Sequence, residues 1–209
     1  MEKKKLFAVS AAGICLTVIL SGCAKTAKET GFLSTYAKLE PVSSTRMRYI
    51  APNDVTGKYS KFIIEPITVK FYDTKTAKKT ELDDIKHLQE YFHTQILEQK
   101  PDRYQIVSVP GPGVAKLRIA ITNLEKSTPA LNVLPQTKLT GVGLGQASVE
   151  AEMVDSQTGE QLAAAIDSET GSRFSFSGLS KWGDVEAVMK DWAKRLWLRV
   201  DETHGIVQK

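Results

Sequence analysis

The sequence predicts an α+β fold, a two-layer sandwich in which two amphipathic helices cover one mostly antiparallel sheet of about five strands. Several segments alternate between apolar and polar residues, which is the pattern of strands with one buried face. Two longer segments place their apolar residues on a single helical stripe. Because each element has one apolar face, helices and sheet bury these faces against each other, in the order strand-helix-strand-strand-strand-strand-helix.

The first strand is expected over Lys61–Tyr72, an apolar run interrupted by Pro66. Because proline has no N–H to donate to a ladder, a bulge or an unpaired edge is expected there. After a polar loop, the first helix is expected from Thr80 or Glu81 to Lys100, where Pro101 ends it. Its apolar stripe consists of Leu82, Ile85, Leu88, Phe92 and Ile96.

Four further strands and a second helix follow. The strands are expected over Tyr104–Val109, Val114–Leu124, Leu144–Asp155 and Gln161–Ser168. The turn between the last two contains Gly159, which can take the positive φ of a hairpin turn. The second helix is expected over Trp182–Thr203, with Trp192 on its apolar stripe and Trp197 at the flank, partly exposed.

One face of the predicted sheet is polar and carries Lys116, Arg118, Glu150 and Glu152. This face is either solvated or meets a partner. The glycine-rich run Gly141-Val142-Gly143-Leu144-Gly145 lacks the downstream helix and the lysine of a phosphate-binding loop, so it is a strand entry or a bulge. A mobile loop that contacts a partner is the alternative. The possible partner contacts are therefore Gly141, Gly143, Gly145 and Arg118.

The N-terminus has the layout of a bacterial lipoprotein signal. A basic head precedes the uncharged run Leu6–Leu20, and two small residues, Ser21 and Gly22, stand directly before Cys23. The uncharged run is shorter than the ~20 apolar residues of a spanning helix. We expect cleavage between Gly22 and Cys23, and attachment of diacylglycerol and a fatty acyl group to Cys23.

Cleavage at this position determines the charge and the cysteine content of the mature chain. Cys15 leaves with the signal, so no intramolecular disulfide is possible. The formal charge of +4 falls to +2, with 25 basic and 23 acidic residues, which argues against a nucleic-acid partner. The predicted organisation is a signal over 1–22, a lipidated tether and docking segment over 23–60, a globular domain over 61–204 and a tail over 205–209.

The segment after the tether is apolar at helical spacing, through Phe32, Leu33, Tyr36 and Leu39. It is predicted to dock against the domain; a contact with the membrane or a partner is the alternative. A loop is expected over Pro41–Ser60.

No residue pattern points to catalysis, a metal or a cofactor. His87, Glu90 and His93 do not have the i, i+4 spacing that puts two histidine ligands on one helix face. The sequence also has no G-x-S-x-G motif, and Ser177 stands only in a glycine-containing loop. We therefore expect a protein without enzymatic activity, and a hydrolase is the least favoured alternative.

Short strings from Gly31 to Asp201 carry a further signal. They are Gly31-Phe32-Leu33, Leu39-Glu40-Pro41, Phe62-Ile63-Ile64-Glu65-Pro66, Pro110-Gly111-Pro112-Gly113, Ala147-Ser148-Val149-Glu150-Ala151-Glu152 and Trp182-Gly183-Asp184-Val185. Together they resemble a family of proteobacterial envelope lipoproteins known only as a domain of unknown function. The resemblance implies a Gram-negative source and carries no activity.

The residue after the lipidated cysteine guides sorting in Gram-negative lipoproteins, and Ala24 stands there instead of the aspartate that favours inner-membrane retention. The resemblance thus implies the periplasmic leaflet of the outer membrane. The expected role is a non-enzymatic structural or auxiliary module that is anchored to the membrane by lipid and binds an envelope partner. A periplasmic lipid- or glycan-binding protein is the alternative.

Overall fold

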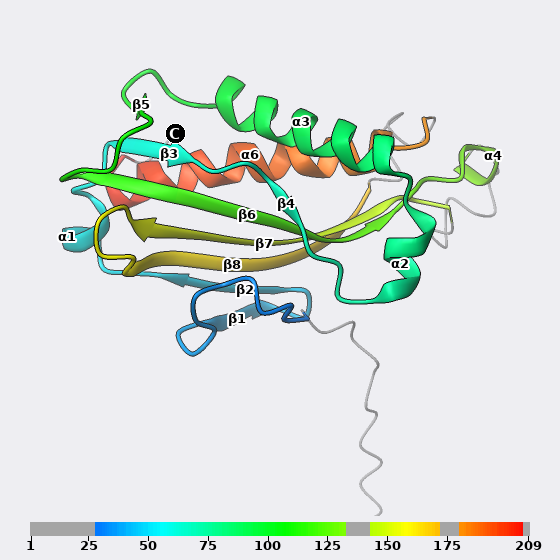
Figure 1. Ribbon diagram of the computed structural model, residues 1–209, viewed down its shortest axis with the longest axis horizontal. Coiled ribbons are helices and arrows are strands. Elements are labelled where there is room, and N and C mark those ends of the chain that lie inside the picture. The colour runs from blue at the N-terminus through cyan, green and yellow to red at the C-terminus, as the bar shows by residue number, and fades with distance from the viewer. Residues whose placement is uncertain (1–27, 133–142, 172–179, 207–209) are drawn as a thin grey trace, which may run out of the picture.

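The computed structural model of this chain describes residues 28–132, 143–171 and 180–206 (Figure 1). One mixed sheet has the strand order β1-β2-β8-β7-β6-β3-β5, and β4 pairs with β6 beyond the end of β3. The strands are β1 (Glu40–Ser43), β2 (Arg46–Ile50), β3 (Lys61–Ile64), β4 (Thr68–Val69), β5 (Gln105–Ile106), β6 (Val114–Glu125), β7 (Gln146–Asp155) and β8 (Gln161–Thr170). The helices are α1 (Asn53–Thr56), α2 (Thr74–Lys79), α3 (Leu82–Glu98), α4 (Pro129–Asn132) and α6 (Gly183–Thr203).

The α+β class is confirmed and the longest strand pairings are antiparallel as predicted, whereas the predicted number of about five strands is wrong. The described sheet has eight strands, and β3 runs parallel to both β5 and β6. The parallel pairing follows from α3, because a helix between two strands carries the chain back before the second strand begins. The two longest antiparallel pairings, β6 with β7 and β7 with β8, form the centre of the sheet.

The strand predicted over 61–72 is two short strands, β3 and β4, separated by Pro66. This confirms the expected break, since proline cannot donate to the ladder. Pairing resumes beyond it, where the Lys70 N–H donates to the Ile121 carbonyl at 2.9 Å.

The loop predicted over Pro41–Ser60 is wrong, because β1, β2 and α1 lie within it. Strand β2 pairs antiparallel with β8, from Arg46 opposite Asp167 to Ile50 opposite Ala163. The sheet thus extends in front of residue 61, into the segment assigned from the sequence to docking. A loop is also expected over residues 73–80, but these residues contain α2. The Asp73 carboxylate caps the first turn of α2 by accepting from the Thr76 N–H at 2.7 Å.

The main core lies between the sheet and the two long helices, which cover one face side by side (Figure 1). Both helices fall where the sequence predicts them, and the apolar stripe of α3 is buried at Leu88, Phe92 and Ile96, whereas Leu82 at its start is exposed. The opposing strand residues are those predicted by alternation, among them Leu117, Ile119, Ile121, Val149 and Met153.

Trp197 belongs to this core, so the prediction of its partial exposure is wrong. Its side chain is 2% exposed and its ring lies edge-on to Phe62. Its indole N–H donates to the Ile96 carbonyl of α3 at 2.7 Å. This bond joins α6 to the last turn of α3, so the side of α6 that carries Trp197 packs against α3.

The opposite face of the sheet is covered by the chain's own N-terminal segment. Residues 28–39, which we call the strap, cross β7 and β8 without forming a helix. Leu33 is buried there against Ala164 and Ile166 of β8. The predicted docking of this segment is confirmed. None of the helices in the described ranges has the length and hydropathy needed to cross a bilayer.

Two leucines of α3 provide a matched test of this packing. Leu88→Ala should lower the free energy of unfolding by about 2–5 kcal/mol, because the side chain is 0% exposed and its removal leaves a cavity. Leu82→Ala should change it by less than about 0.5 kcal/mol, because Leu82 is 83% exposed. Urea unfolding followed by circular dichroism measures both, and equal losses would contradict the arrangement of α3.

Candidate functional site

The residues predicted for lipid attachment and cleavage, Cys23 and Gly22, lie outside the described residues, as does Gly141 of the glycine-rich run. Gly143 forms a half-buried turn whose carbonyl accepts from the Thr128 N–H at 2.8 Å. Its role as a partner contact stays a prediction.

Gly145 is buried in a close contact between three chain segments. Its N–H donates to the Asp184 carboxylate at 2.9 Å, and the Ser127 hydroxyl donates to the same oxygen at 2.8 Å. A Cβ on Gly145 would lie 2.9 Å from Ser127 Oγ, and one on Gly171 would lie 2.4 Å from Asp184 Cβ. Glycine is therefore needed here for packing against the first turn of α6, and its burial does not suit a contact with a partner.

Arg118 lies on the polar face of β6 and is half-buried beneath the strap. Its guanidinium forms an ion pair with Glu152 of β7 and lies 5.2 Å from the centre of the Phe32 ring. The Glu152 carboxylate also accepts from the Ser34 N–H at 2.9 Å and from the Ser34 hydroxyl at 2.7 Å. Arg118 is thus engaged by the chain's own strap, and a partner contact by this residue stays a prediction.

Glu150 is the second buried carboxylate of β7. Among the described residues, its hydrogen bonds come from the strap. It accepts from the Thr30 N–H and from the Tyr36 hydroxyl, each at 2.6 Å. Burial, together with the hydrogen bond to Glu150, raises the pKa of Tyr36, so the phenol stays protonated as this bond requires. With Glu150 and Glu152 at 0% and 1% exposure, the central part of the polar face is not solvated.

Two of the three histidines make contacts at the ends of the long helices. His87 Nε2 lies 2.7 Å from Glu186 Oε1, which joins α3 to the start of α6. His204 lies against the Tyr104 ring at the other end of α6. Within residues 28–132, 143–171 and 180–206, no three histidine, cysteine, aspartate or glutamate side chains come together as metal ligands.

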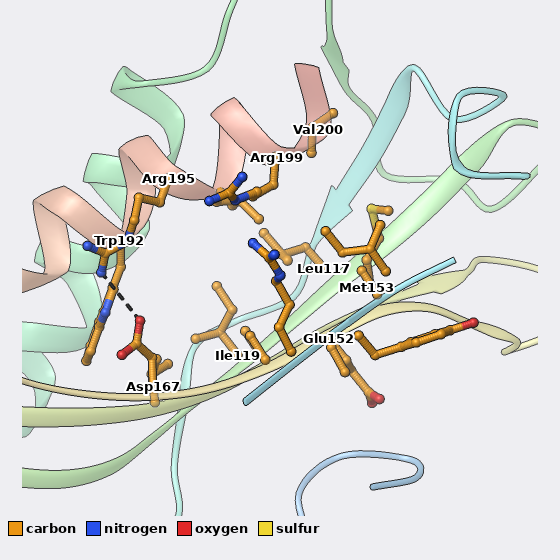
Figure 2. A pocket seen from close by; sticks show the side chains of 18 of the residues that line it. Leu117, Ile119, Glu152, Met153, Asp167, Trp192, Arg195, Arg199 and Val200 are labelled. Atoms are coloured by element: carbon orange, nitrogen blue, oxygen red, sulfur yellow. Dashed lines mark hydrogen bonds and ion pairs between the residues drawn. The ribbon is translucent and has the colours of Figure 1, made fainter. Parts of the chain in front are cut away.

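A cavity of about 170 Å³ lies between α6 and the strands that extend beyond it. Figure 2 shows Trp192, Arg195, Arg199 and Val200 of α6 on one side, with Leu117 and Ile119 of β6 on the other. The sheet side of the lining consists mainly of Leu117, Ile119, Val149, Ala151, Ala163 and Ala165. Three alanines in neighbouring positions of β7 and β8 leave space beside α6 that larger side chains would fill.

Arginines stand along the edge of this groove, two from β2 and two from α6. Arg46 Nε lies 2.8 Å from Asp167, and Arg195 Nη2 lies 2.6 Å from Glu169, so these two acids hold β2, β8 and α6 together. Burial acts to lower the pKa of Arg46, but its ion pairs with Asp167 and Glu169 outweigh this effect and the pKa is raised.

The other two arginines are less engaged. Arg199 pairs with Glu202 on the exposed surface of α6 at 2.6 Å, and such i, i+3 pairs contribute little. Arg48 lines the cavity and has no ion pair with any residue in the described ranges. A groove with apolar walls and cationic groups at its edge can bind an apolar group attached to an anion.

The sequence analysis did not identify this groove. A signal was present in Arg46-Met47-Arg48-Tyr49, which alternates with the period of a strand and puts both arginines on one face. The distance along the chain between β2 and α6 hides their meeting, because only the β2–β8 pairing brings them together.

The fold and the groove define an α+β domain, with helices on one face of a mixed sheet and the strap on the other. The chain belongs to the family of proteins of unknown function DUF3313, whose model matches residues 28–196. The resemblance to a family known only as a domain of unknown function is confirmed. No curated protein matches the chain.

Several solved structures are similar in part. The PelC dodecamer from Paraburkholderia phytofirmans is 14% identical over 75% of this chain and 97% of its own, with a TM-score of 0.44. Protein XCC0632 from Xanthomonas campestris is 11% identical over 75% and 92% of the two chains, with a TM-score of 0.42. Lipoprotein GNA1162 from Neisseria meningitidis is 15% identical over 66% and 96%, with a TM-score of 0.27.

Removal of one hydroxyl tests the contact between the strap and the sheet. Tyr36→Phe should lower the free energy of unfolding by about 1–3 kcal/mol, because the buried Glu150 carboxylate loses one of its donors. Tyr49→Phe is the matched control, since the Tyr49 ring packs in the same cluster while its hydroxyl makes no hydrogen bond to a described residue. Urea unfolding measures both variants, and a loss in Tyr49→Phe as large as in Tyr36→Phe would contradict the role of the Tyr36–Glu150 bond.

Proposed function

We propose that this protein is a lipid-anchored module of the cell envelope, without enzymatic activity, that acts by binding rather than by catalysis. The support for the anchor is the string Leu20-Ser21-Gly22-Cys23 behind a basic head and a short apolar run. Diacylglycerol and a fatty acyl group on Cys23 would attach it, and Ala24 favours the periplasmic leaflet of the outer membrane.

The observation that carries this proposal is the strap on the buried carboxylates of β7. Thr30 is the first residue of the strap that is bonded to Glu150, and it stands seven residues after Cys23. Seven extended residues span at most about 25 Å. A lipid on Cys23 would therefore hold the sheet close to the membrane surface, since the strap is bonded along its length to β7.

The buried acids of the described domain support a binding module better than a catalyst. Asp184 is bonded to Ser127 and Gly145, and Asp201 is bonded to Arg103 and to the Tyr104 hydroxyl. Each acid thus joins a helix end to a neighbouring segment. We propose an envelope protein as the partner of the anchored domain.

The groove beneath α6 favours a second candidate function, the binding of a small ligand in the periplasm. Its lining is mostly aliphatic and aromatic. A glycan needs many hydrogen-bonding groups, whereas an acyl chain needs none, so a lipid fits this lining better than a glycan.

The anchor is tested by substituting the cysteine. In cells labelled with radioactive palmitate, the Cys23→Ser protein should lose the label and leave the membrane fraction, because it cannot form the thioether. Cys15→Ser, within the segment expected to be removed, should keep both. Retention of label and membrane association by Cys23→Ser would overturn the proposal.

The partner is tested separately, by crosslinking in cells and capture of the anchored protein. Capture of the Arg118→Gln and Tyr36→Phe variants should recover less of any envelope protein that binds to the face of the sheet covered by the strap than capture of the unsubstituted chain does. Recovery of no envelope protein above the level in cells that lack the chain would count against an auxiliary role.

A further inference from the structure

We propose that the groove between α6 and strands β2 and β8 binds the alkyl chain of a separate amphiphile with a single anionic head group. The proposal deepens the ligand-binding candidate above, because it names the class of ligand for that site. The occupant is a one-chain molecule with a carboxylate or a phosphate at its end, such as a fatty acid or a lysophospholipid.

The walls of the groove indicate an alkyl chain. Ala151, Ala163 and Ala165 form a smooth sheet surface opposite Trp192 and Leu196 of α6. The cavity of about 170 Å³ is smaller than the ~300–1,000 Å³ of sites for drug-sized ligands, so it holds only a segment of an alkyl chain. An apolar cavity of about 150 Å³ binds small apolar molecules in other proteins.

The edge of the groove indicates an anionic head. Arg46 and Arg195 are neutralised by Asp167 and Glu169, which they share. Arg48 has no such partner among the described residues, and Arg199 has only the exposed Glu202. Both arginines line the cavity, so two guanidinium groups are available there to donate charge-assisted hydrogen bonds to a carboxylate or phosphate.

The lipid expected on Cys23 is not the occupant. The strap that follows Cys23 covers the face of the sheet opposite to α6, through Thr30 on Glu150 and Ser34 on Glu152. Lys28 Nζ lies 4.5 Å from the centre of the Tyr72 ring, just before α2. Arg199 lies near the C-terminal end of α6, which is at the end of the domain away from α2 (Figure 1). The first described residues of the strap thus lie at the opposite end and on the opposite face from the groove.

Trp192 gives the test a reporter inside the groove. It lines the cavity, whereas Trp182 and Trp197 do not. Seven residues of helix separate it from Arg199, a rise of about 10 Å, so the middle of a chain with its head at Arg199 would lie near the Trp192 indole. Bromine atoms at that depth quench indole fluorescence on contact.

The mature, lipidated full-length protein would be held in amphipol and titrated with 9,10-dibromostearate and with its lysophosphatidylglycerol ester, below their micellar concentrations. Dibromostearyl alcohol is the uncharged probe, and unbrominated stearate is the control for non-specific effects. Saturable quenching by the carboxylate, the phosphate or both is expected. Comparison of the two titrations shows whether the groove prefers a fatty acid or a lysophospholipid. The alcohol should bind at least about fivefold more weakly.

Two variants and one matched control locate the binding. Arg48→Gln should weaken binding of the anionic probes at least about fivefold and leave binding of the alcohol unchanged. The substitution breaks no ion pair of the described fold. Ala165→Phe should abolish quenching by filling the groove; urea unfolding shows whether it folds. Lys190→Gln removes one positive charge from the exposed side of α6 and should bind as the unsubstituted chain does.

Quenching that is equal for the alcohol and the anions, or that survives Arg48→Gln unchanged, would overturn the proposal. An absence of quenching would also overturn it. In that case, a dimer that is seen by sedimentation and disrupted by Ala165→Phe would show that a second copy of the chain occupies the groove instead. The unsubstituted chain keeps Cys23, so an absence of quenching in that chain, with the palmitate label retained, would reject the groove ligand and leave the anchored module in place.

Discussion

The buried carboxylates of Glu150 and Glu152, in the middle of the central strand β7, constrain much of this structure. A buried carboxylate is stable only when hydrogen-bond donors or a cation reach it. Within the sheet, β6 supplies Arg118 and β8 supplies the Gln161 amide, which donates to Glu152 at 2.9 Å, and further donors come from outside the sheet. The strap supplies the N–H groups of Thr30 and Ser34 and the hydroxyl of Tyr36. The N-terminal segment is therefore a structural part of the domain and not only a tether.

The same strand determines the other layer. Successive side chains of β7 point to opposite faces, so Val149, Ala151 and Met153 face the helices while the acids face the strap. Helices α3 and α6 cover the middle and one side of the sheet (Figure 1). Strands β8 and β2 continue beyond α6, and their helix-side residues become small or charged. The alanines and the arginines at this border produce the groove.

The border also shows how ion pairs can join elements without closing the space between them. Asp167 and Glu169 bind Arg46 from β2 and Arg195 from α6, which connects the edge of the sheet to the helix. The aliphatic parts of arginine side chains can cover apolar surface while the guanidinium groups stay at the solvent boundary. The apolar surface beneath them is accordingly accessible to a narrow ligand.

Local patterns in the sequence were sufficient for the elements that bury one complete face. The alternation in β6 and β7 and the stripes of α3 and α6 predict their positions closely, because the helical and strand periods depend only on neighbouring residues. Pro66 predicts the break between β3 and β4 for a similarly local reason, its missing N–H. In β1 and β2 the pattern is weaker, since arginines replace the apolar residues on one face and β1 is exposed.

The sequence by itself thus determined the α+β class, the two long helices and the central antiparallel strands, and it predicts a lipoprotein signal over residues 1–22. Only the tertiary structure decided that β3 and β6 are parallel, that β2 extends the sheet, that the strap buries Glu150 and Glu152, and that Arg48 comes near α6. These features depend on pairings between residues 53 to 121 positions apart, from Lys61 with Val114 to Arg46 with Asp167. A short sequence pattern reports which face of an element is apolar, but the partner of that face depends on strand order and register.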